Sequence, residues 1–543
     1  MADTRQTILA VGIVIALVIG IGIGYLAAPK GGVQTQTVTS TVTETKTMTE
    51  TTTVTAGGGG TTVKEITYFG INALEEIPTS DIITVTVDGI TYRIPKFVAD
   101  KIVEGIKSEA EAQGVSEIRV VVWASGSPVD VTRVTNVERA AKIVTAILDK
   151  YGVGVKVVVD MEKSQFFRKG YWTQLEQAFV ANQAPDIFAM KDLGKVAEAG
   201  YAIMLDKYIA KYWPLVADTY KNLWRSVTYK GHIWAVPQDT EARPLYFRKD
   251  VLRKLGWSED EINALPEKIR TGEITLEDLI GVAKEAMQKG LVQWGFYHRP
   301  NFGGTPFIIL YYQYGGILQD PVTGKLVLDK QAMLKTLKIL YKMAQEDKVL
   351  PTTMVGTEWR KIHTDFVNGR VLFWFGGTWH WAEWQRVPYH EQLGNLTEEY
   401  EWKNIGFALV PAPEKGLKPM TLSSPFLYYV SSQTKFPETC FILVAIATSG
   451  PLDARHAVDS GHLPVRMTTQ FDKYYQKSEF HRKVVYMLEY TSFEPIHEKW
   501  GVYKEAWINA IAKVERGEET PEQALNEMIS AIQSELGDEV IIK

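Results

Sequence analysis

Alternation of apolar and polar residues is clearest between Ile82 and Ile94, on both sides of Asp88-Gly89. This pattern predicts two antiparallel strands joined by a tight turn, because Asp-Gly accepts the left-handed backbone of a two-residue hairpin loop. A helix is expected next, from about Pro95 to Gln113. These elements form a small hairpin-helix extension, residues 63–117, for which the sequence indicates no function.

Strand and helix patterns then alternate along the chain. Continuous apolar runs predict strands at 118–123, 153–160 and 185–190, and amphipathic periodicity predicts helices at 136–151 and 171–182. This order is typical of an α/β domain with a parallel sheet covered by helices on both faces. Ligands of open α/β sheets bind beyond the carboxyl ends of the strands. Those ends carry Ser125-Gly126-Ser127, Glu162-Lys163 and Lys191-Asp192.

The charged segment that begins at Asp239 separates this region from a second one. It follows a strand-like run that ends at Pro237 and precedes an aromatic strand, Leu-Tyr-Phe-Arg, and a helix that opens at Asp250. The segment is either a loop between two strands of one sheet or a crossover between two domains. In the second case Glu241 is exposed in the cleft between the domains. Further strands are expected at 293–297, within 366–375, at 405–411 and at 427–431, with helices between and after them.

The first 62 residues have a different composition. Ile8 to Ala28 is an almost uninterrupted apolar run of about the length that crosses a bilayer, and no clear cleavage site or lipoprotein cysteine follows it. The run is either an uncleaved membrane anchor, which we favour, or a signal peptide, and we assign it to residues 1–30. Residues 31–62 are rich in Thr and end near a run of four glycines, which predicts an extended stalk and a flexible linker.

Composition excludes several classes of protein. The net charge of −5 gives no basic surface for nucleic acid. The single cysteine, Cys440, lies in an apolar helical run and is expected to be buried, so no disulfide or cysteine metal site is predicted. No strand is followed by a phosphate-binding glycine motif, and the nine histidines show no zinc-binding spacing. No cofactor and no metal are therefore expected.

Several segments occur in an order that resembles the family-1 extracellular solute-binding proteins of ABC importers, the group that contains the maltose- and trehalose-binding proteins. The resemblance covers about Ile118 to Leu536 and is carried by six segments. These are Ala184-Pro-Asp-Ile-Phe; Lys230-Gly-His-Ile-Trp-Ala-Val-Pro with Leu245-Tyr-Phe-Arg-Lys-Asp; Asn368-Gly-Arg-Val-Leu-Phe-Trp-Phe-Gly-Gly-Thr-Trp; Ile405-Gly-Phe-Ala-Leu-Val-Pro; Gly461-His-Leu-Pro-Val-Arg; and Gly517-Glu-Glu-Thr-Pro-Glu-Gln-Ala-Leu.

The resemblance implies an α/β fold of periplasmic-binding-protein type II, with two lobes and the ligand cleft between them. Lobe 1 is expected to comprise 118–240 and about 405–450, and lobe 2 to comprise 241–404 and about 451–543. The expected ligand is a sugar, which the protein passes to membrane permease subunits that work with ATPase subunits. The anchor and stalk place the protein on the outer side of the cytoplasmic membrane.

The resemblance also implies which residues bind the sugar. The positions that match the family's binding residues are polar side chains and aromatic rings, and Asp239 is added because it is two residues from Glu241. They are Ser125, Ser127, Asp192, Asp239, Glu241, Arg299, Asn301, Phe302, Trp379, Arg466, Trp500 and Tyr503. Charged groups suit sugar hydroxyls and flat rings suit the apolar faces of sugars. The acidic residue that maltose-binding members carry near Ser125 and Ser127 is missing, which leaves the sugar open.

Some of these residues could instead have purely structural roles. Glu241 could form a surface ion pair with Arg243 or Arg248, and Asp192 could cap the helix that follows it. Other functions also remain open. Asp239 and Glu241 could share a strand face as the two carboxylates of a glycosidase, although no nucleophile motif is present. A solute-sensing receptor would need a cytoplasmic domain, and a peptide or other solute could replace the sugar.

Overall fold

The computed structural model describes residues 66–543, apart from 69–70, 74–80, 168 and 302–305. The described residues belong to one compact unit, Thr53–Lys543. The expected anchor and stalk lie outside the described residues, as does Phe302. Within the described part of the chain, no helix has both the length and the apolar character needed to cross a bilayer.

The predicted N-terminal hairpin is confirmed. Strands β3 (Ile82–Val87) and β4 (Ile90–Pro95) pair antiparallel, and the loop residues Asp88 and Gly89 have φ of 51° and 76°. Short strands β1 (Ile66–Tyr68) and β2 (Ile71–Ala73) extend this sheet in the order β2-β1-β4-β3. Helix α2 (Lys96–Gln113) follows the hairpin as predicted and packs against α15 and α3 of the first lobe.

The first lobe is built on a five-stranded sheet in the order β12-β19-β9-β6-β8. The expected strand at 118–123 is divided in two at Val121, whose amide donates to Asp186 Oδ2 at 2.8 Å. Strand β6 runs parallel to β8 and β9, as predicted, whereas β19 runs antiparallel to β9 and β12 because the chain re-enters this sheet from the second lobe.

The strands of this lobe are β5 (Glu117–Val120), β6 (Val122–Ser125), β7 (Lys156–Val159), β8 (Gln165–Phe167), β9 (Ile187–Met190), β10 (Thr228–Tyr229), β11 (His232–Ile233), β12 (Val236–Pro237) and β19 (Leu427–Val430). Its helices are α3 (Thr132–Lys150), α4 (Tyr171–Val180), α5 (Leu193–Glu198), α6 (Asp206–Lys211), α15 (Pro437–Ala447) and α16 (Gly450–Ser460). Helix α3 packs between β7 and α15, and Cys440 on α15 is buried, as expected from the sequence.

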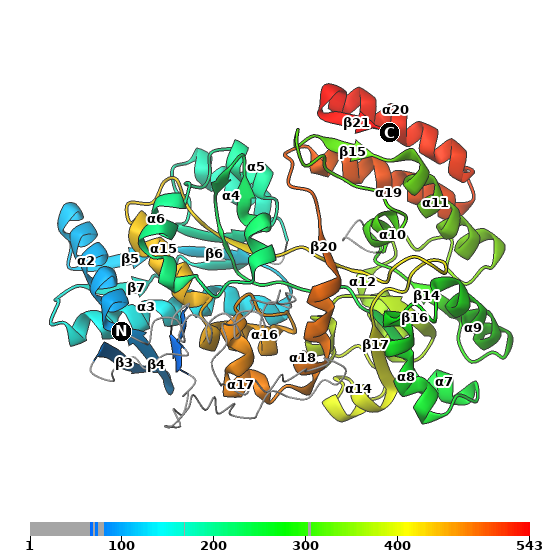
Figure 1. The fold of residues 1–543 in the computed structure, drawn as a ribbon, viewed down its shortest axis with the longest axis horizontal. Coiled ribbons are helices and arrows are strands. Elements are labelled where there is room, and N and C mark those ends of the chain that lie inside the picture. The colour runs from blue at the N-terminus through cyan, green and yellow to red at the C-terminus, as the bar shows by residue number, and fades with distance from the viewer. Residues whose placement is uncertain (1–65, 69–70, 74–80, 168, 302–305) are drawn as a thin grey trace, which may run out of the picture. The chain divides into compact units, whose positions relative to one another are not determined.

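The second lobe is built on a four-stranded sheet in the order β14-β16-β13-β17. Its strands are β13 (Leu245–Arg248), β14 (Trp294–Tyr297), β16 (Val371–Phe375) and β17 (Ile405–Ala408). Smaller parallel pairs are β15 (Leu326–Leu328) with β21 (Val540–Ile542) and β18 (Thr421–Ser423) with β20 (Thr491–Phe493). In Figure 1 helices α8 and α9 lie beside this sheet and α19 and α20 lie together near the C-terminus.

The helices of this lobe are α7 (Lys249–Lys254), α8 (Glu259–Arg270), α9 (Leu276–Gln288), α10 (Phe307–Gln313), α11 (Lys330–Tyr341), α12 (Trp359–Val367), α13 (His380–Trp384), α14 (Glu398–Asn404), α18 (Glu479–Val484), α19 (Trp500–Arg516) and α20 (Pro521–Leu536). Helix α17 (Lys473–Gln476) packs instead on α16 of the first lobe. Helix α20 begins after Thr520, whose side chain accepts from the Gln523 amide, while Pro521 takes the first helical position, where no amide hydrogen is needed.

Three segments of the chain, which contain Thr240, Ser423 and Leu463, meet between the two lobes. Thr240 forms an isolated antiparallel bridge with Leu463, and its hydroxyl lies 2.5 Å from Ser423 Oγ. The charged segment that begins at Asp239 is therefore a crossover between two sheets and not a loop of one sheet. Strand β17 pairs with β13 in the second sheet. The chain therefore returns to the first sheet after β17, and not at about residue 405 as expected from the sequence. Helix α16 packs on α3 of the first lobe.

Candidate ligand-binding site

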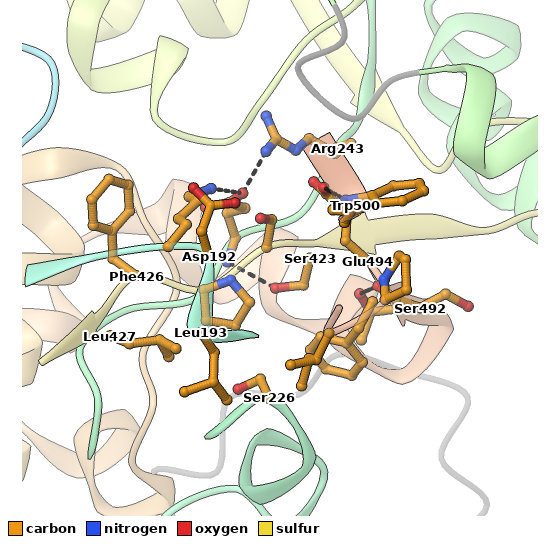
Figure 2. Close-up of a pocket in the computed structure, with 18 of the residues that line it drawn as sticks. Asp192, Leu193, Ser226, Arg243, Ser423, Phe426, Leu427, Ser492, Glu494 and Trp500 are labelled. Carbon is orange, nitrogen blue, oxygen red and sulfur yellow. Dashed lines mark hydrogen bonds and ion pairs between the residues drawn. The ribbon is translucent and has the colours of Figure 1, made fainter. Parts of the chain in front are cut away.

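A cavity of about 870 Å³ opens at the crossover, with walls from both lobes. Ser127, Lys191 and Asp192 contribute from the first lobe, and Arg299, Trp379 and Trp500 from the second. Figure 2 shows Asp192 and Phe426 on one side of the cavity and Glu494 and Trp500 on the other. A volume of this size fits a ligand larger than a single ring, since ordinary small-molecule sites measure about 300–1,000 Å³.

Trp379 presents a half-buried indole to the cavity, at the point where β16 passes into α13. The ring folds back over Gly377, where a Cβ would lie only 2.2 Å from the indole, so the glycine before it is a steric requirement. The indole stacks on His462 with ring centroids 5.5 Å apart and an interplanar angle of 11°. The pair forms a flat aromatic wall of the kind that suits the C–H face of a sugar.

Glu241 lies at the crossover and is fully buried, so the expectation that it is exposed in the cleft is wrong. Its Oε1 accepts from Arg243 Nη2 at 2.5 Å and from Lys191 Nζ at 3.1 Å. The pairing with Arg243 suggested by the sequence is therefore real, but it is buried in the cavity wall. Glu241 Oε2 makes no hydrogen bond, and it remains available as an acceptor facing the cavity.

Asp192 is exposed and adopts a left-handed backbone with φ of 65° directly before α5. Its side chain makes no capping hydrogen bond, so the competing role of helix cap is not realised. A non-glycine residue with positive φ is uncommon and marks a position held by its surroundings. The carboxylate is directed into the cavity from the first lobe, opposite Glu494.

Trp500 lies at the start of α19, and its indole nitrogen donates to Glu494 Oε2 at 2.8 Å. Lys504 Nζ lies 3.6 Å from the same oxygen. Burial raises the pKa of Glu494, but Lys504 and the Trp500 hydrogen bond outweigh it, and the net effect lowers the pKa. Glu494 is therefore an ionised acceptor in the cavity at neutral pH.

A buried charge network closes the base of the cavity next to α3. Arg133 Nη2 lies 2.6 Å from Asp239 Oδ2, Nη1 lies 3.3 Å from Asp130, and Nη1 also donates to the Ser125 carbonyl. Gly126 is required here, because a Cβ would lie 2.3 Å from Arg133 Nη1. Burial raises the pKa of Asp239, but Arg133, His462 and His456 together hold it well below its usual value.

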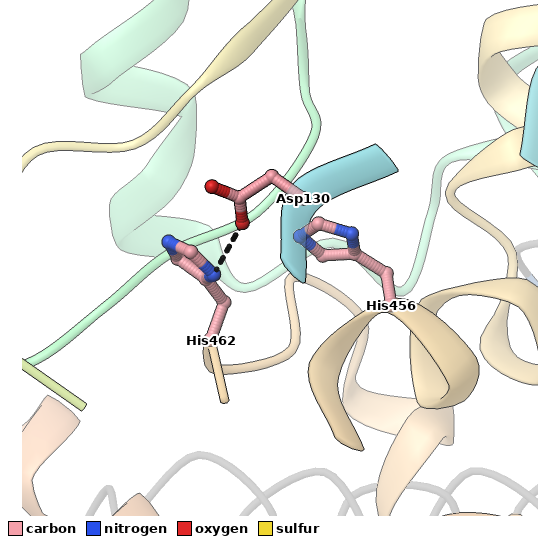
Figure 3. Close-up of side chains that lie close together, drawn as sticks. All are labelled: Asp130, His456 and His462. Carbon is pink, nitrogen blue, oxygen red and sulfur yellow. Dashed lines mark ion pairs between the residues drawn. The ribbon is translucent and has the colours of Figure 1, made fainter. Parts of the chain in front are cut away.

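Histidines and carboxylates gather in this network although no local spacing in the sequence indicated it. Figure 3 shows His462 beside Asp130, with Nδ1 at 3.3 Å from Oδ1, and His456 close by. Such a group has the donor types of a metal site, and so does the buried group His363, His380 and Glu383. In the first group the Arg133 guanidinium already supplies a positive charge between the carboxylates. The residues form an ion-pair network around Arg133 and the two histidines.

Six of the twelve residues expected to bind ligand line the cavity: Ser127, Asp192, Glu241, Arg299, Trp379 and Trp500. Phe302 lies outside the described residues. The remaining five, Ser125, Asp239, Asn301, Arg466 and Tyr503, are not among the residues of the cavity wall.

Internal contacts explain most of these five positions. Asp239 pairs with Arg133, and Ser125 holds the same guanidinium through its carbonyl. The buried Arg466 guanidinium forms an ion pair with Asp218 at 3.1 Å and donates to Thr448 Oγ1 at 2.7 Å. Tyr503 donates to the Val327 carbonyl at 3.0 Å, and Asn301 is exposed. Asp239 and Glu241 therefore do not both face the cavity, as two catalytic carboxylates would have to.

Other residues of the cavity wall were not singled out from the sequence: Arg133, Lys191, Arg243, Trp359, Phe426, His462 and Glu494. Two signals were available. Lys191 lies at a strand end named above, and His462 lies within a segment that carried the family resemblance. Arg133, inside a helix, and Trp359, at a helix start, carry no local sign of a site.

Two α/β lobes with three chain passages between them, and a polar and aromatic cavity at the crossover, define a two-lobed ligand-binding protein. The comparisons with known proteins agree. The family model of the bacterial extracellular solute-binding proteins matches residues 136–438. The chain belongs to this family, and the resemblance noted in the sequence is confirmed.

The maltotriose-binding protein of Pyrococcus abyssi is 23% identical over 313 residues, which are 54% of this chain and 57% of that protein. The match thus spans little more than half the length of this relative. Among solved structures, the GacH receptor of Streptomyces glaucescens, known in unliganded and acarbose-bound forms, superimposes with a TM-score of 0.61 at 19% identity. The alignment covers 78% of this chain and 99% of that one.

An ABC substrate-binding protein from Listeria monocytogenes in complex with cycloalternan gives a TM-score of 0.59 at 18% identity, over 77% of this chain and 99% of that one. At these identities the similarity establishes the two-lobed fold. The matched family and these structural relatives are binding proteins.

Proposed function

We propose that the protein binds a di- or oligosaccharide in the cavity between its lobes and delivers it to an ABC importer. The observation that carries the proposal is the cavity wall itself. It combines unpaired acceptors and donors, among them Glu241 Oε2 and Ser127 Oγ, with the aromatic ring of Trp379. Sugars need this mixture, because they present hydroxyls at their edges and C–H groups on their faces.

The relatives support the same class of ligand. The Pyrococcus abyssi relative is named for maltotriose, and the structures described above hold acarbose and cycloalternan. The family's partners are the permease and ATPase subunits of an importer, which take up ligand from the closed binding protein. Walls from two lobes support a closure mechanism, because ligand that touches both lobes favours the closed arrangement.

The test is a thermal-shift screen of the full chain against a library of mono- to tetrasaccharides. A sugar that binds only the folded protein raises its apparent stability by about 2.7 kcal/mol when present at 100 times Kd. We expect at least one sugar to raise Tm in a saturable way, and calorimetry to return one site per chain. No shift with any sugar, together with a shift caused by peptides, would assign the cavity to another solute.

We also propose that residues 1–62 anchor the protein at the outer face of the cytoplasmic membrane and act as a spacer. The motivation is the apolar run Ile8–Ala28 followed by the Thr-rich segment. An exterior location agrees with the extracellular family to which the chain belongs.

Fractionation tests the anchor. We expect the full chain in the membrane pellet and released only by detergent, and a chain that starts at Thr62 in the soluble fraction. Because the cavity is built entirely from later residues, we expect both forms to have the same Kd for the sugar found in the screen. A full chain that stays soluble, or a shortened chain that has lost binding, contradicts the proposal.

A further inference from the structure

Two guanidinium groups lie against the Trp379 indole in the cavity wall. Arg243 Cζ lies 4.5 Å and Arg299 Cζ 5.4 Å from the ring centroid. Arg299 also lies over Trp359, at 4.7 Å. Stacking of this kind satisfies the face of a guanidinium and leaves its N–H groups, which lie in its plane, to find acceptors elsewhere.

Several of those N–H groups find no acceptor within the described protein, although Arg243 Nη2 donates to Glu241. Nε and Nη1 of Arg243 and Nε and Nη1 of Arg299 are buried without a hydrogen-bond partner. Arg133, equally buried on the opposite side of the crossover, has its nitrogens bonded to Gln238, Asp239 and the Ser125 carbonyl. Arg243 and Arg299 thus each keep two unpaired donors in the cavity wall, whereas buried Arg466, away from the cavity, keeps one. Buried donors without partners are costly.

The charges in this part of the wall are also unbalanced. Glu241 is shared between Arg243 and Lys191, and no carboxylate of the described residues lies within ion-pair distance of Arg299. The undescribed neighbours 302–305 contain no acidic residue. Burial and the neighbouring Arg243 lower the pKa of Arg299 to about 9, because no ion-paired carboxylate offsets them.

The nearest further carboxylates are already engaged. Glu383 accepts from the Tyr389 hydroxyl at 2.7 Å and lies 3.3 Å from His380 Nδ1. Glu494 is held by Trp500 and Lys504. Lys191 and Arg243 thus share the carboxylate of Glu241, and Arg299 has no ion-pair partner among the described residues.

We propose that the sugar bound in this cavity is acidic, and that its anionic group, a carboxylate or a phosphate, binds between Arg243 and Arg299. This inference rests on the proposed function and narrows its ligand class. A neutral hydroxyl would accept one or two of the four hydrogen bonds but would leave the charge of Arg299 uncompensated. A carboxylate or phosphate has the planar or forked geometry that guanidinium groups match, and it supplies the missing charge.

The test compares acidic with neutral sugars, and each uronate with its own methyl ester. The probes are di- and trisaccharides of galacturonate, glucuronate and mannuronate, their methyl esters, glucose 6-phosphate, and neutral malto-oligosaccharides. Each is titrated calorimetrically into the full chain, into Arg299→Gln, and into Arg299→Lys, which keeps the charge but loses the fork. Arg516→Gln, an exposed arginine on α19 that pairs with Glu518, is the matched control for the loss of one positive charge.

We expect one acidic probe to bind at least tenfold more tightly than its ester or its neutral counterpart. Arg299→Gln should reduce that preference to less than threefold, Arg299→Lys should retain part of it, and Arg516→Gln should leave it unchanged. A uronate or the hexose phosphate as the preferred probe identifies the anion as carboxylate or phosphate.

Two results overturn the inference in different ways. Tight binding of neutral sugars, with no acidic probe preferred or with a preference that Arg299→Gln leaves intact, refutes the acidic ligand and leaves the proposed function standing. Binding of no sugar at all, in a protein with an unchanged apo melting curve, refutes both. The melting curve of each variant separates loss of the anion site from loss of the fold.

Discussion

At the scale of single residues, buried arginines of the cavity wall and of the second lobe's core can differ in how their donors are satisfied. In the core of the second lobe, Arg248 donates to the carbonyls of Phe366 and Val367 and to Asp250. In the cavity wall, Arg299 keeps two donors unbonded. Since buried polar groups in folded proteins are almost always paired, an unpaired group beside a cavity indicates the position of a ligand.

Glu401 on α14 is a buried polar residue away from the cavity, and it makes stability depend on pH. Its Oε2 accepts from Gln385 at 2.7 Å, Oε1 has no partner, and burial raises its pKa to about 9. A carboxyl whose folded pKa is raised contributes its full stability below the unfolded value near 4.5. That contribution is lost as the pH rises toward 9.

Glu401→Gln should therefore flatten the dependence of stability on pH. Between pH 5 and pH 8 we expect the wild-type free energy of unfolding to fall relative to the variant by more than about 1 kcal/mol, because each unit of pKa shift corresponds to about 1.4 kcal/mol. Urea unfolding at both pH values measures this. Glu399→Gln, at an exposed position of the same helix, is the control. Parallel pH profiles for wild type and Glu401→Gln would contradict the raised pKa.

At the scale of elements, the crossover after β12 is held by the carboxylate of Asp239. Besides its pairing with Arg133, it accepts from the Phe426 amide at 3.1 Å and lies 2.9 Å from His456 Nε2. The side chain thus joins α3, the return passage before β19, and α16. Helix α3 is far in the sequence from the other two segments, and Asp239 contacts all three.

Asp239→Asn should cost up to about 3–5 kcal/mol of stability, because it leaves the buried Arg133 charge with Asp130 as its remaining carboxylate partner. The pKa of Asp239 is depressed, so this stabilisation is present above the unfolded value near 3.8 and is lost as the pH falls below it. The gap between variant and wild type should therefore narrow in acid. Asp192→Asn, an exposed carboxylate of the same cavity, should change stability by less than about 0.5 kcal/mol. If Asp239→Asn were as stable as Asp192→Asn, Asp239 would have no structural role at the crossover.

Part of this fold could be predicted from the sequence, and part could not. The hairpin at Asp88-Gly89, the alternating strands and helices of the first lobe, and the cap at Thr520 follow from local chemistry, and the structure confirms them. The place of β17 in the second sheet and the direction of β19 depend on long-range pairing. No local pattern encodes such pairing, so it could not be predicted.

The site shows the same limit. Trp379 and Glu241 could be expected in the cavity, one from a Gly-Gly-Thr-Trp segment and the other from its place between two strands. Asp239 has the same local appearance as Glu241, yet Arg133 holds it away from the cavity wall. Only the packing of α3 against the crossover distinguishes the two carboxylates, and that packing involves a residue more than one hundred positions away.

At the scale of the described unit as a whole, the walls of the cavity belong to two separately packed lobes. Lys191 and Asp192 follow a strand of the first sheet, whereas Trp379 and Trp500 belong to the second lobe. A ligand that touches both gains contacts when the lobes approach each other, so it should shift the population toward the closed arrangement.

Small-angle scattering with and without the sugar from the screen measures this closure. We expect a smaller radius of gyration at saturating sugar in the chain that starts at Thr62, because the segment outside the lobes is then removed. Trp379→Ala, at concentrations where sugar does not bind, should give the unliganded curve. A scattering curve unchanged by saturating sugar would mean that binding does not bring the lobes together.

The central claim is that sugar binds in this cavity against Trp379, and calorimetric titration of wild type and Trp379→Ala tests it most directly. Truncation removes the ring that lines the cavity and supports Arg243 and Arg299, so we expect a loss of about 1–3 kcal/mol of binding free energy. The apo melting temperature should change little, and Trp213→Ala, an exposed tryptophan outside the cavity, should bind as wild type does. The predicted result is one saturable site that Trp379→Ala weakens by roughly 5- to 150-fold. Unchanged affinity of Trp379→Ala, or a collapsed apo melting temperature with no specific loss of binding, would contradict the account.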